Sequence, residues 1–242
     1  MFKNLFPNKI INLSDKFFNF LLIIMLALFI IGLIYAIFIS PPDYIQGESV
    51  RIMYVHVPSS FMALGCFAFI GIASIGNLIF KIKILPLMAK SLASVGFVFT
   101  VISLVTGSLW GKPTWGTWWV WDARLTSVFI LFLIYMGHIG LVRSIEDHTK
   151  SAKAAAILTL IGAINIPIIK FSVDWWNTLH QPASIIRVDG PTIHSSMLVP
   201  LILMAISFMS FYFSFVLLNT QTELYKRRLK AIFVKSLIEG KK

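Results

Sequence analysis

Cysteine is almost absent from this chain of 242 residues, which contains only Cys66. A single thiol excludes an internal disulfide, a CxxC redox pair and a CxxCH motif. Because Cys66 lies inside an apolar stretch, we expect it to be a small core residue. The chain also has no Walker A motif, no HExxH and no nucleophile elbow. We therefore predict that it is not an enzyme and does not hydrolyse ATP itself.

Charge is scarce as well, at 13% of residues, whereas hydrophobic residues make up 57% and the mean hydropathy is +0.84. Soluble proteins are about a quarter charged. A helix of about 20 apolar residues spans a bilayer core, and a central charge would cost it about 2.5–3.5 kcal/mol. Six stretches without Asp, Glu, Lys or Arg meet this requirement: 17–39, 57–80, 91–110, 125–142, 154–169 and 196–218. We predict an all-α integral membrane protein, a single domain (1–242) of six transmembrane helices.

Two of these stretches have individual features. The first is 23 residues long, longer than the apolar region of a signal peptide, so we expect a retained helix. The fifth contains Pro167, which removes a backbone donor and predicts an irregular outer end.

The net charge of +11 is unevenly placed along the chain. Sixteen Lys and Arg residues fall on the side that has both termini, and five fall on the other side: Arg51, Lys112, Arg124, Lys170 and Arg187. The positive-inside rule therefore predicts cytoplasmic termini and three outer loops, 40–56, 111–124 and 170–195. We expect the basic tail, 219–242, to be helical and to lie near the cytoplasmic surface. Its partner would be anionic lipid, not nucleic acid.

Tryptophan is concentrated on the predicted outer face. All seven tryptophans lie in or beside the last two outer loops, and five fall between Trp110 and Trp121. Anchoring at the membrane interface would enrich aromatic residues at both faces. The one-sided placement favours a binding surface, and the alternative is an aromatic belt with a snorkelling arginine.

The segment 111–124 also has a helical spacing. Four residues stand at i, i+3, i+4 and i+7, a pattern typical of one helical face: Trp115, Trp118, Trp119 and Asp122. Gly111, Pro113 and Gly116 predict a break before that point. We therefore expect a loop that leads into a short helix along the interface. Arg124 can hold a carboxylate by two hydrogen bonds, or it can pair with Asp122.

Histidines complete the outer face. His56, in RIMYVHVPSS, and His180, in VDWWNTLHQPAS, both stand beside the tryptophan-containing loops. Neutral imidazole is a common axial ligand of iron in a flat macrocycle, so this pair predicts such a site. His194 is a weaker candidate. We expect His138 to be a packing residue near a helix end and His148 to be solvated.

The motif WGTWWVWDARLTS resembles the tryptophan-rich WWD signature of the haem-handling protein superfamily. The length, the six spans and the two histidine segments resemble its short haem-export members from bacterial cytochrome c maturation. The resemblance implies haem b held on the periplasmic face of the bacterial inner membrane, with His56 and His180 as axial ligands. It further implies a platform made of Trp115, Trp118, Trp119, Trp121, Asp122 and Arg124. Arg51 and Arg187 are further candidates for contact with the propionates.

The resemblance also implies partners. These are an ATP-binding subunit, a second permease-like subunit, a small single-span subunit and a periplasmic haem chaperone that receives the haem. One alternative is a structural, permease-like subunit that binds no haem and uses the tryptophans to dock partner helices. A membrane enzyme is a third reading, but a b-type cytochrome would place histidine pairs inside facing helices, and the spans contain only His138.

Overall fold

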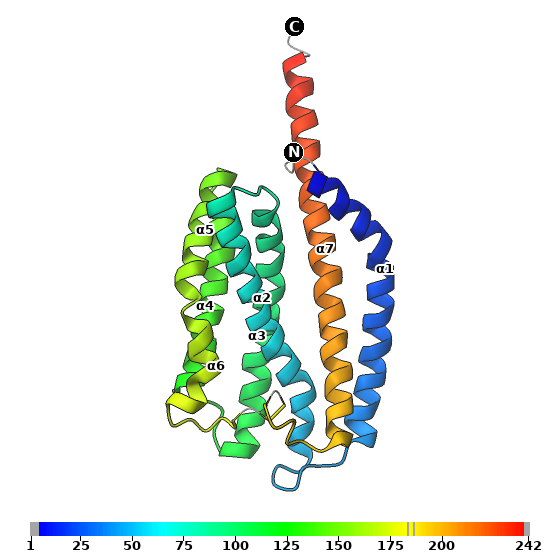
Figure 1. Cartoon of the computed structure of the whole chain (residues 1–242), viewed down its shortest axis with the longest axis vertical. Helices are drawn as coiled ribbons and strands as arrows, with labels where there is room; N and C mark the ends of the chain where they lie inside the picture. Colours follow the sequence, from blue (N-terminus) through cyan, green and yellow to red (C-terminus); the bar gives the residue numbers. More distant parts are fainter. Residues whose placement is uncertain (1–4, 183, 186, 240–242) are drawn as a thin grey trace.

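The computed structural model describes residues 5–182, 184–185 and 187–239, and its regular structure is helical (Figure 1). Six helical segments of the described chain are long and apolar enough to cross a membrane. The predicted all-α class and six spans are thus confirmed. Lys3, Lys241 and Lys242, which entered the charge count, lie outside the described residues. The helices are α1 (Leu5–Ile34), α2 (Met53–Phe80), α3 (Leu85–Trp115), α4 (Ala123–Ser144), α5 (His148–Gly162), α6 (Asn165–Trp175) and α7 (Ser195–Glu239). A π-helix, η1 (Tyr35–Ile39), follows α1, and a 3-10 helix, η2 (Glu48–Ile52), precedes α2.

The helices divide into a long pair and a larger group. Helices α1 and α7 pack along each other, while α4, α5 and α6 lie on the opposite side of the bundle (Figure 1). Helices α2 and α3 pack together between these groups, and both contact α7. Both ends of the described chain lie at the same end of the bundle (Figure 1). The loops after α1, α3 and α6 gather at the other end.

Close packing at the centre depends on small residues. Tyr135 of α4 is fully buried, and its hydroxyl donates to the Ala63 carbonyl of α2 over 2.7 Å. A Cβ atom on Gly96 of α3 would lie only 2.1 Å from the Tyr135 hydroxyl oxygen. Small residues at such crossings let helices approach in lipid, where contact and hydrogen bonds replace the hydrophobic effect. Cys66 is buried in this core, as predicted.

The fifth span is two helices with a break between them. Helix α5 ends at Gly162, and α6 begins at Asn165, two residues before Pro167. The Asn165 side chain donates to the buried Ser127 carbonyl of α4 over 2.7 Å, which fixes the break against its neighbour. This span is interrupted, as expected, but the break lies before Pro167, and the outer end that was predicted to be irregular is the helix α6.

Helix α7 is much longer than the others. Its 45 residues correspond to about 68 Å at 1.5 Å per residue, more than a bilayer requires. The basic tail is helical through Glu239, as predicted, and continues α7 beyond the ends of the other helices (Figure 1). Its position relative to the membrane surface stays a prediction.

Candidate functional site

His56 lies in the first turns of α2, next to α3. Its Nδ1 is 3.1 Å from the Thr106 hydroxyl, and that hydroxyl donates its own proton to the Ile102 carbonyl over 2.6 Å. When the Thr106 proton is on the Ile102 carbonyl, the Thr106 oxygen accepts from His56, and the imidazole proton is then on Nδ1. The other nitrogen, Nε2, is left without a proton and has no hydrogen bond among the described residues. This is the tautomer in which Nε2 can bind a metal.

Two residues of α3 shape the space around His56. Gly107 lies against the ring, because a Cβ atom there would be 3.0 Å from Cε1 of His56. The Trp110 ring meets His56 edge-on, with ring centres 5.7 Å apart. The indole N–H of Trp110 donates to the Gln46 side chain over 2.8 Å, which ties the first outer loop to the site.

His180 lies in the loop after α6 and faces His56. The two ring centres are 6.5 Å apart, and the ring planes are inclined by 37°. The Trp115 ring centre is 6.2 Å from that of His180. The structure therefore brings together both histidines predicted as ligands, although 124 positions separate them in the chain.

The surroundings of His180 favour its neutral form. Burial lowers its pKa, and the charge of Arg124 lowers it further. A hydrogen bond to the Gln181 carbonyl and the charge of Asp122 act in the opposite direction. The pKa lies below its ordinary value, so the ring is neutral near pH 7, which a metal ligand requires.

Arg124 connects three parts of the site. At the start of α4, its Nε donates to the Ser172 hydroxyl of α6 over 2.9 Å. One terminal nitrogen is 3.3 Å from the Lys170 carbonyl, and the other is 3.3 Å from Nδ1 of His180. The guanidinium is therefore in direct contact with a predicted iron ligand.

Asp122 has a structural role at the same place. One carboxylate oxygen caps α4 by accepting from the Leu125 backbone N–H over 2.8 Å. The other accepts from the Leu179 N–H at 3.3 Å, next to His180. Asp122 and Arg124, both described by the structure, form no ion pair. Asp122 joins the tryptophan segment to the histidine loop.

The predicted short helix in the tryptophan segment is wrong. Helix α3 passes through Gly111 and Pro113 and ends at Trp115, and Gly116 then adopts φ +79° as its cap. Residues 116–122 are not helical, so the i, i+3, i+4, i+7 spacing does not place its four residues on one face. Pro113 lies inside the helix and removes the donor for a carbonyl four residues earlier, so α3 lacks one backbone hydrogen bond near its end.

The tryptophans of this segment fall into two groups. Trp115 lies at His180, whereas Trp119, Trp121 and Phe129 form an edge-to-face cluster with ring centres 5.4–6.2 Å apart. Trp118 and Trp121 are 54% and 72% exposed. The buried N–H of Trp119 has no partner among the described residues. A buried donor without a partner is uncommon in proteins.

The remaining predicted arginines lie apart from the histidines. Arg51 is engaged by the Glu48 carboxylate and by the carbonyls of Ala36 and Ser40. Arg187 is exposed in the loop before α7. No contact of either side chain with His56 or His180 is found among the described residues.

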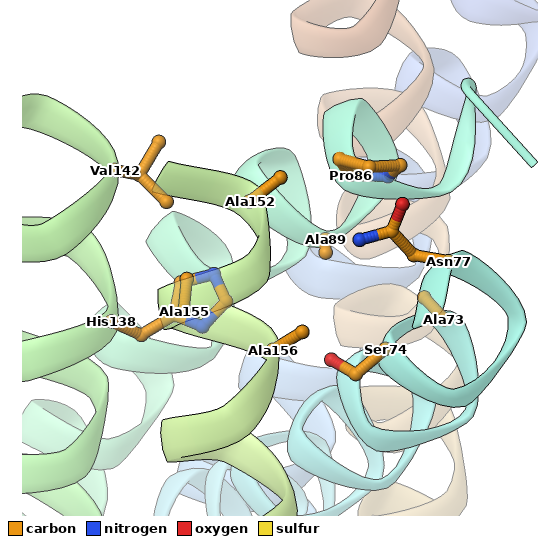
Figure 2. A pocket seen from close by; sticks show the side chains of 10 residues that line it. All are labelled: Ala73, Ser74, Asn77, Pro86, Ala89, His138, Val142, Ala152, Ala155 and Ala156. Carbon is orange, nitrogen blue, oxygen red and sulfur yellow. The ribbon is translucent and has the colours of Figure 1, made fainter. Parts of the chain in front are cut away.

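A further histidine lies near the opposite end of the bundle. His138 of α4 is buried and lines a cavity of about 20 Å³ together with Ser74 and Asn77 of α2 (Figure 2). Its Nδ1 is 2.9 Å from the Thr159 hydroxyl, and its Nε2 has no partner among the described residues. This space has room for about one water molecule and none for a macrocycle. His148 is exposed, as predicted.

Several site residues were not predicted from the sequence. They are Gln46, Thr106, Gly107, Trp110 and Ser172, which hold or border the predicted residues. Thr106, Gly107 and Trp110 lie within one turn at the outer part of the third span. Their position next to a tryptophan-containing loop was the one sequence signal that they belong to the site. The residues that they contact lie on other segments of the chain, which the sequence does not reveal.

Comparison with known proteins gives consistent matches across the chain. A profile of the family described as "Heme exporter protein C" matches residues 2–235. Heme exporter protein C of Bradyrhizobium diazoefficiens is 45% identical over 226 residues, which cover 93% of this chain and 86% of the relative. The Haemophilus influenzae protein of that name is 44% identical over 222 residues, covering 92% and 89%. A Marchantia polymorpha protein, "Putative cytochrome c biosynthesis ccmC-like mitochondrial protein", is 49% identical over 186 residues, covering 77% and 78%.

The fold and the site together define a multi-pass membrane protein whose histidine and tryptophan side chains meet at one end of an all-α bundle. The match over residues 2–235 and the identities of 44–49% identify the family. The chain belongs to the Heme exporter protein C family.

Proposed function

We propose that this protein is the haem-binding subunit of a haem export and delivery complex in cytochrome c biogenesis. The observation that carries the proposal is the pair of facing histidine rings, His56 and His180, 6.5 Å apart. A coordinating histidine nitrogen lies about 2.0–2.1 Å from its metal, so two axial imidazoles have ring centres about 6 Å apart. The observed separation of the ring centres is close to that value.

The small number of side chains that could coordinate a metal supports haem, and not a bare metal ion, as the ligand. Among the described residues, no group of three or more His, Cys, Asp or Glu side chains could hold a metal ion. Two histidines suffice when a macrocycle supplies the other four ligands. With one cysteine in the chain, a CxxCH attachment is impossible. We propose that the bound form is haem b, held without a covalent link, as cargo to be passed on.

The porphyrin would contact the indole ring of Trp115 beside His180. Trp118, Trp119 and Trp121 would extend this aromatic surface outward from the iron, because indole rings provide rigid, flat contact area. Arg124 is the first candidate to pair with a propionate, since guanidinium binds carboxylates through two parallel hydrogen bonds. Arg51 and Arg187 are secondary candidates, each requiring movement of its side chain.

The uneven distribution of Lys and Arg between the two ends of the bundle supports an orientation in the membrane. With sixteen Lys and Arg residues on the side of the termini and five on the other, we place the termini in the cytoplasm and the site on the periplasmic face of a bacterial inner membrane. There it can pass haem to a periplasmic chaperone. We propose that the other partners are an ATP-binding subunit, a second permease-like subunit and a small single-span subunit.

One observation favours a second function. The side chains of Trp118 and Trp121 are exposed. These two rings could dock partner helices in a structural subunit that binds no haem. That alternative predicts that Trp118→Ala disrupts complex assembly and that the isolated protein never contains haem.

Absorption spectroscopy of the purified protein tests the main proposal. Wild-type protein should contain haem with a six-coordinate, low-spin spectrum, and His56→Ala and His180→Ala should each lose that signature. His148→Ala, which changes an exposed histidine, is the matched control and should keep it. An unchanged spectrum in both ligand variants would refute the assignment.

A further inference from the structure

Nδ1 of His180 has two neighbours that require opposite proton positions. A terminal nitrogen of Arg124 lies 3.3 Å away, and the backbone carbonyl of Gln181 lies 3.0 Å away. A guanidinium only donates hydrogen bonds, whereas a carbonyl only accepts them. A neutral His180 can therefore bond to one of them at a time.

The choice of partner determines whether His180 can bind iron. When Nδ1 accepts from Arg124, the single proton of the neutral ring is on Nε2, and Nε2 cannot coordinate. When Nδ1 carries the proton and donates to Gln181, Nε2 is bare and can coordinate. Metal-binding histidines ordinarily have this second arrangement, with the far ring nitrogen donating to a carbonyl or carboxylate.

His56 differs from His180 in its partner. With the Thr106 proton on the Ile102 carbonyl, the Thr106 oxygen accepts from Nδ1 of His56, and Nε2 is bare. Nδ1 of His180, by contrast, has two competing partners.

We propose that Arg124 gates the iron site by holding His180 in the tautomer that cannot coordinate, and releases it when a propionate takes the guanidinium. This inference rests on the proposed binding of haem. A carboxylate forms stronger, charge-assisted hydrogen bonds than a neutral imidazole nitrogen does. The guanidinium is planar and rigid, so it turns away from His180 as one unit, and its bonds to Ser172 and Lys170 change with it.

The change of tautomer is balanced in protons and charge. Nε2 loses one proton and Nδ1 gains one, and the ring is neutral before and after. Gln181 and Leu179 are exposed on either side of His180, so solvent can carry this proton. With this gate, His180 binds the haem iron only when a propionate of the same haem pairs with Arg124.

Ferric haem dimethyl ester has both propionates esterified. Its binding distinguishes an Arg124 that controls the His180 tautomer from an Arg124 that only binds a propionate. Wild-type protein should bind the ester through His56 alone, without the six-coordinate, low-spin spectrum. Arg124→Met removes the donor, so it should give that spectrum with the ester and bind it about tenfold more tightly, the size of one charge-assisted hydrogen bond. Arg143→Met, at the far end of the same helix, is the matched control and should behave as wild type.

The outcomes are distinct. If wild type and Arg124→Met bind the ester with the same spectrum and affinity, the gate is wrong, even if ordinary haem binds well. If wild type shows no histidine-ligated spectrum with ordinary haem, the proposed function fails instead. Nitrogen-15 NMR of haem-free wild-type protein needs no variant: His180 should carry its proton on Nε2, and a proton found only on Nδ1 would overturn the gate.

Discussion

At the scale of single residues, the site depends on how each imidazole is oriented. Thr106 is the hydrogen-bond partner of His56 Nδ1, and its hydroxyl also lies 2.6 Å from a carbonyl one turn earlier. Supporting residues of this kind keep a ligand in position and raise its basicity. The sequence predicted the two histidines but not Thr106, because a threonine inside a span has no distinguishing feature until its neighbour is known.

Replacing Thr106 by Val should weaken haem binding while leaving the fold intact. The valine has the same shape but cannot accept from Nδ1, and loss of such a partner costs about 10–100-fold in metal affinity. Haem titration of the purified variant measures this. Thr222→Val is the control, since the Thr222 hydroxyl also donates to a carbonyl four residues earlier but contacts no histidine. Equal affinities in wild type and Thr106→Val would remove Thr106 from the site.

Gly107→Ala should displace His56. The added methyl group would stand 3.0 Å from the imidazole, closer than ordinary contact, whereas Gly65 on α2 has open space around its missing side chain. Alanine favours a helix over glycine by about 1 kcal/mol, so neither change should harm the helices. We expect Gly107→Ala to lower haem affinity and to shift the spectrum, and Gly65→Ala to change neither. Identical behaviour of the two variants would show that the ring has room to move.

At the scale of helices, the sequence predicted the spans well and the tryptophan segment poorly. Long apolar runs without charge determine a membrane helix on their own, so the spans and the break near Pro167 were predictable. The end of α3 was not, because Gly111 and Pro113 predict a helix break, whereas the helix continues through both and ends at Trp115. That the segment after Gly116 lies against α3 depends on tertiary contacts, such as the bond from the Ser108 hydroxyl to the Trp118 carbonyl.

Asp122 should matter chiefly as a helix cap. Asp122→Ala removes the acceptor for the Leu125 N–H and should destabilise the protein by about 1 kcal/mol. Asparagine caps helices nearly as well, so Asp122→Asn should retain most of this stability. Thermal unfolding in detergent compares them. If the Asn variant loses as much stability as the Ala variant, the negative charge and not the cap is what the fold requires.

At the scale of the whole molecule, the arrangement separates the termini from the histidine site. Both ends of the described chain lie at one end of the bundle, and the loops after α1, α3 and α6 lie at the other (Figure 1). Sequence alone predicted this separation because an even number of spans returns the chain to its starting side. Which side faces the cytoplasm follows from the charge asymmetry and is open to direct test.

Cysteine labelling tests the orientation. Cys66 is buried, so a Cys66→Ala background provides a chain without thiols. In intact spheroplasts, a membrane-impermeant maleimide should label Asp189→Cys, in the loop before α7, and should label Lys153→Cys only after lysis. The reverse pattern would place the histidine site in the cytoplasm and would exclude delivery to a periplasmic chaperone.

The most direct test of the central claim is a cryo-electron microscopy structure of the haem-loaded protein. It should show the iron between His56 and His180, about 2.0–2.1 Å from both Nε2 atoms, with Trp115 against the porphyrin and Arg124 turned from His180 to a propionate. Haem bound elsewhere, or iron coordinated by only one of these histidines, would contradict the account.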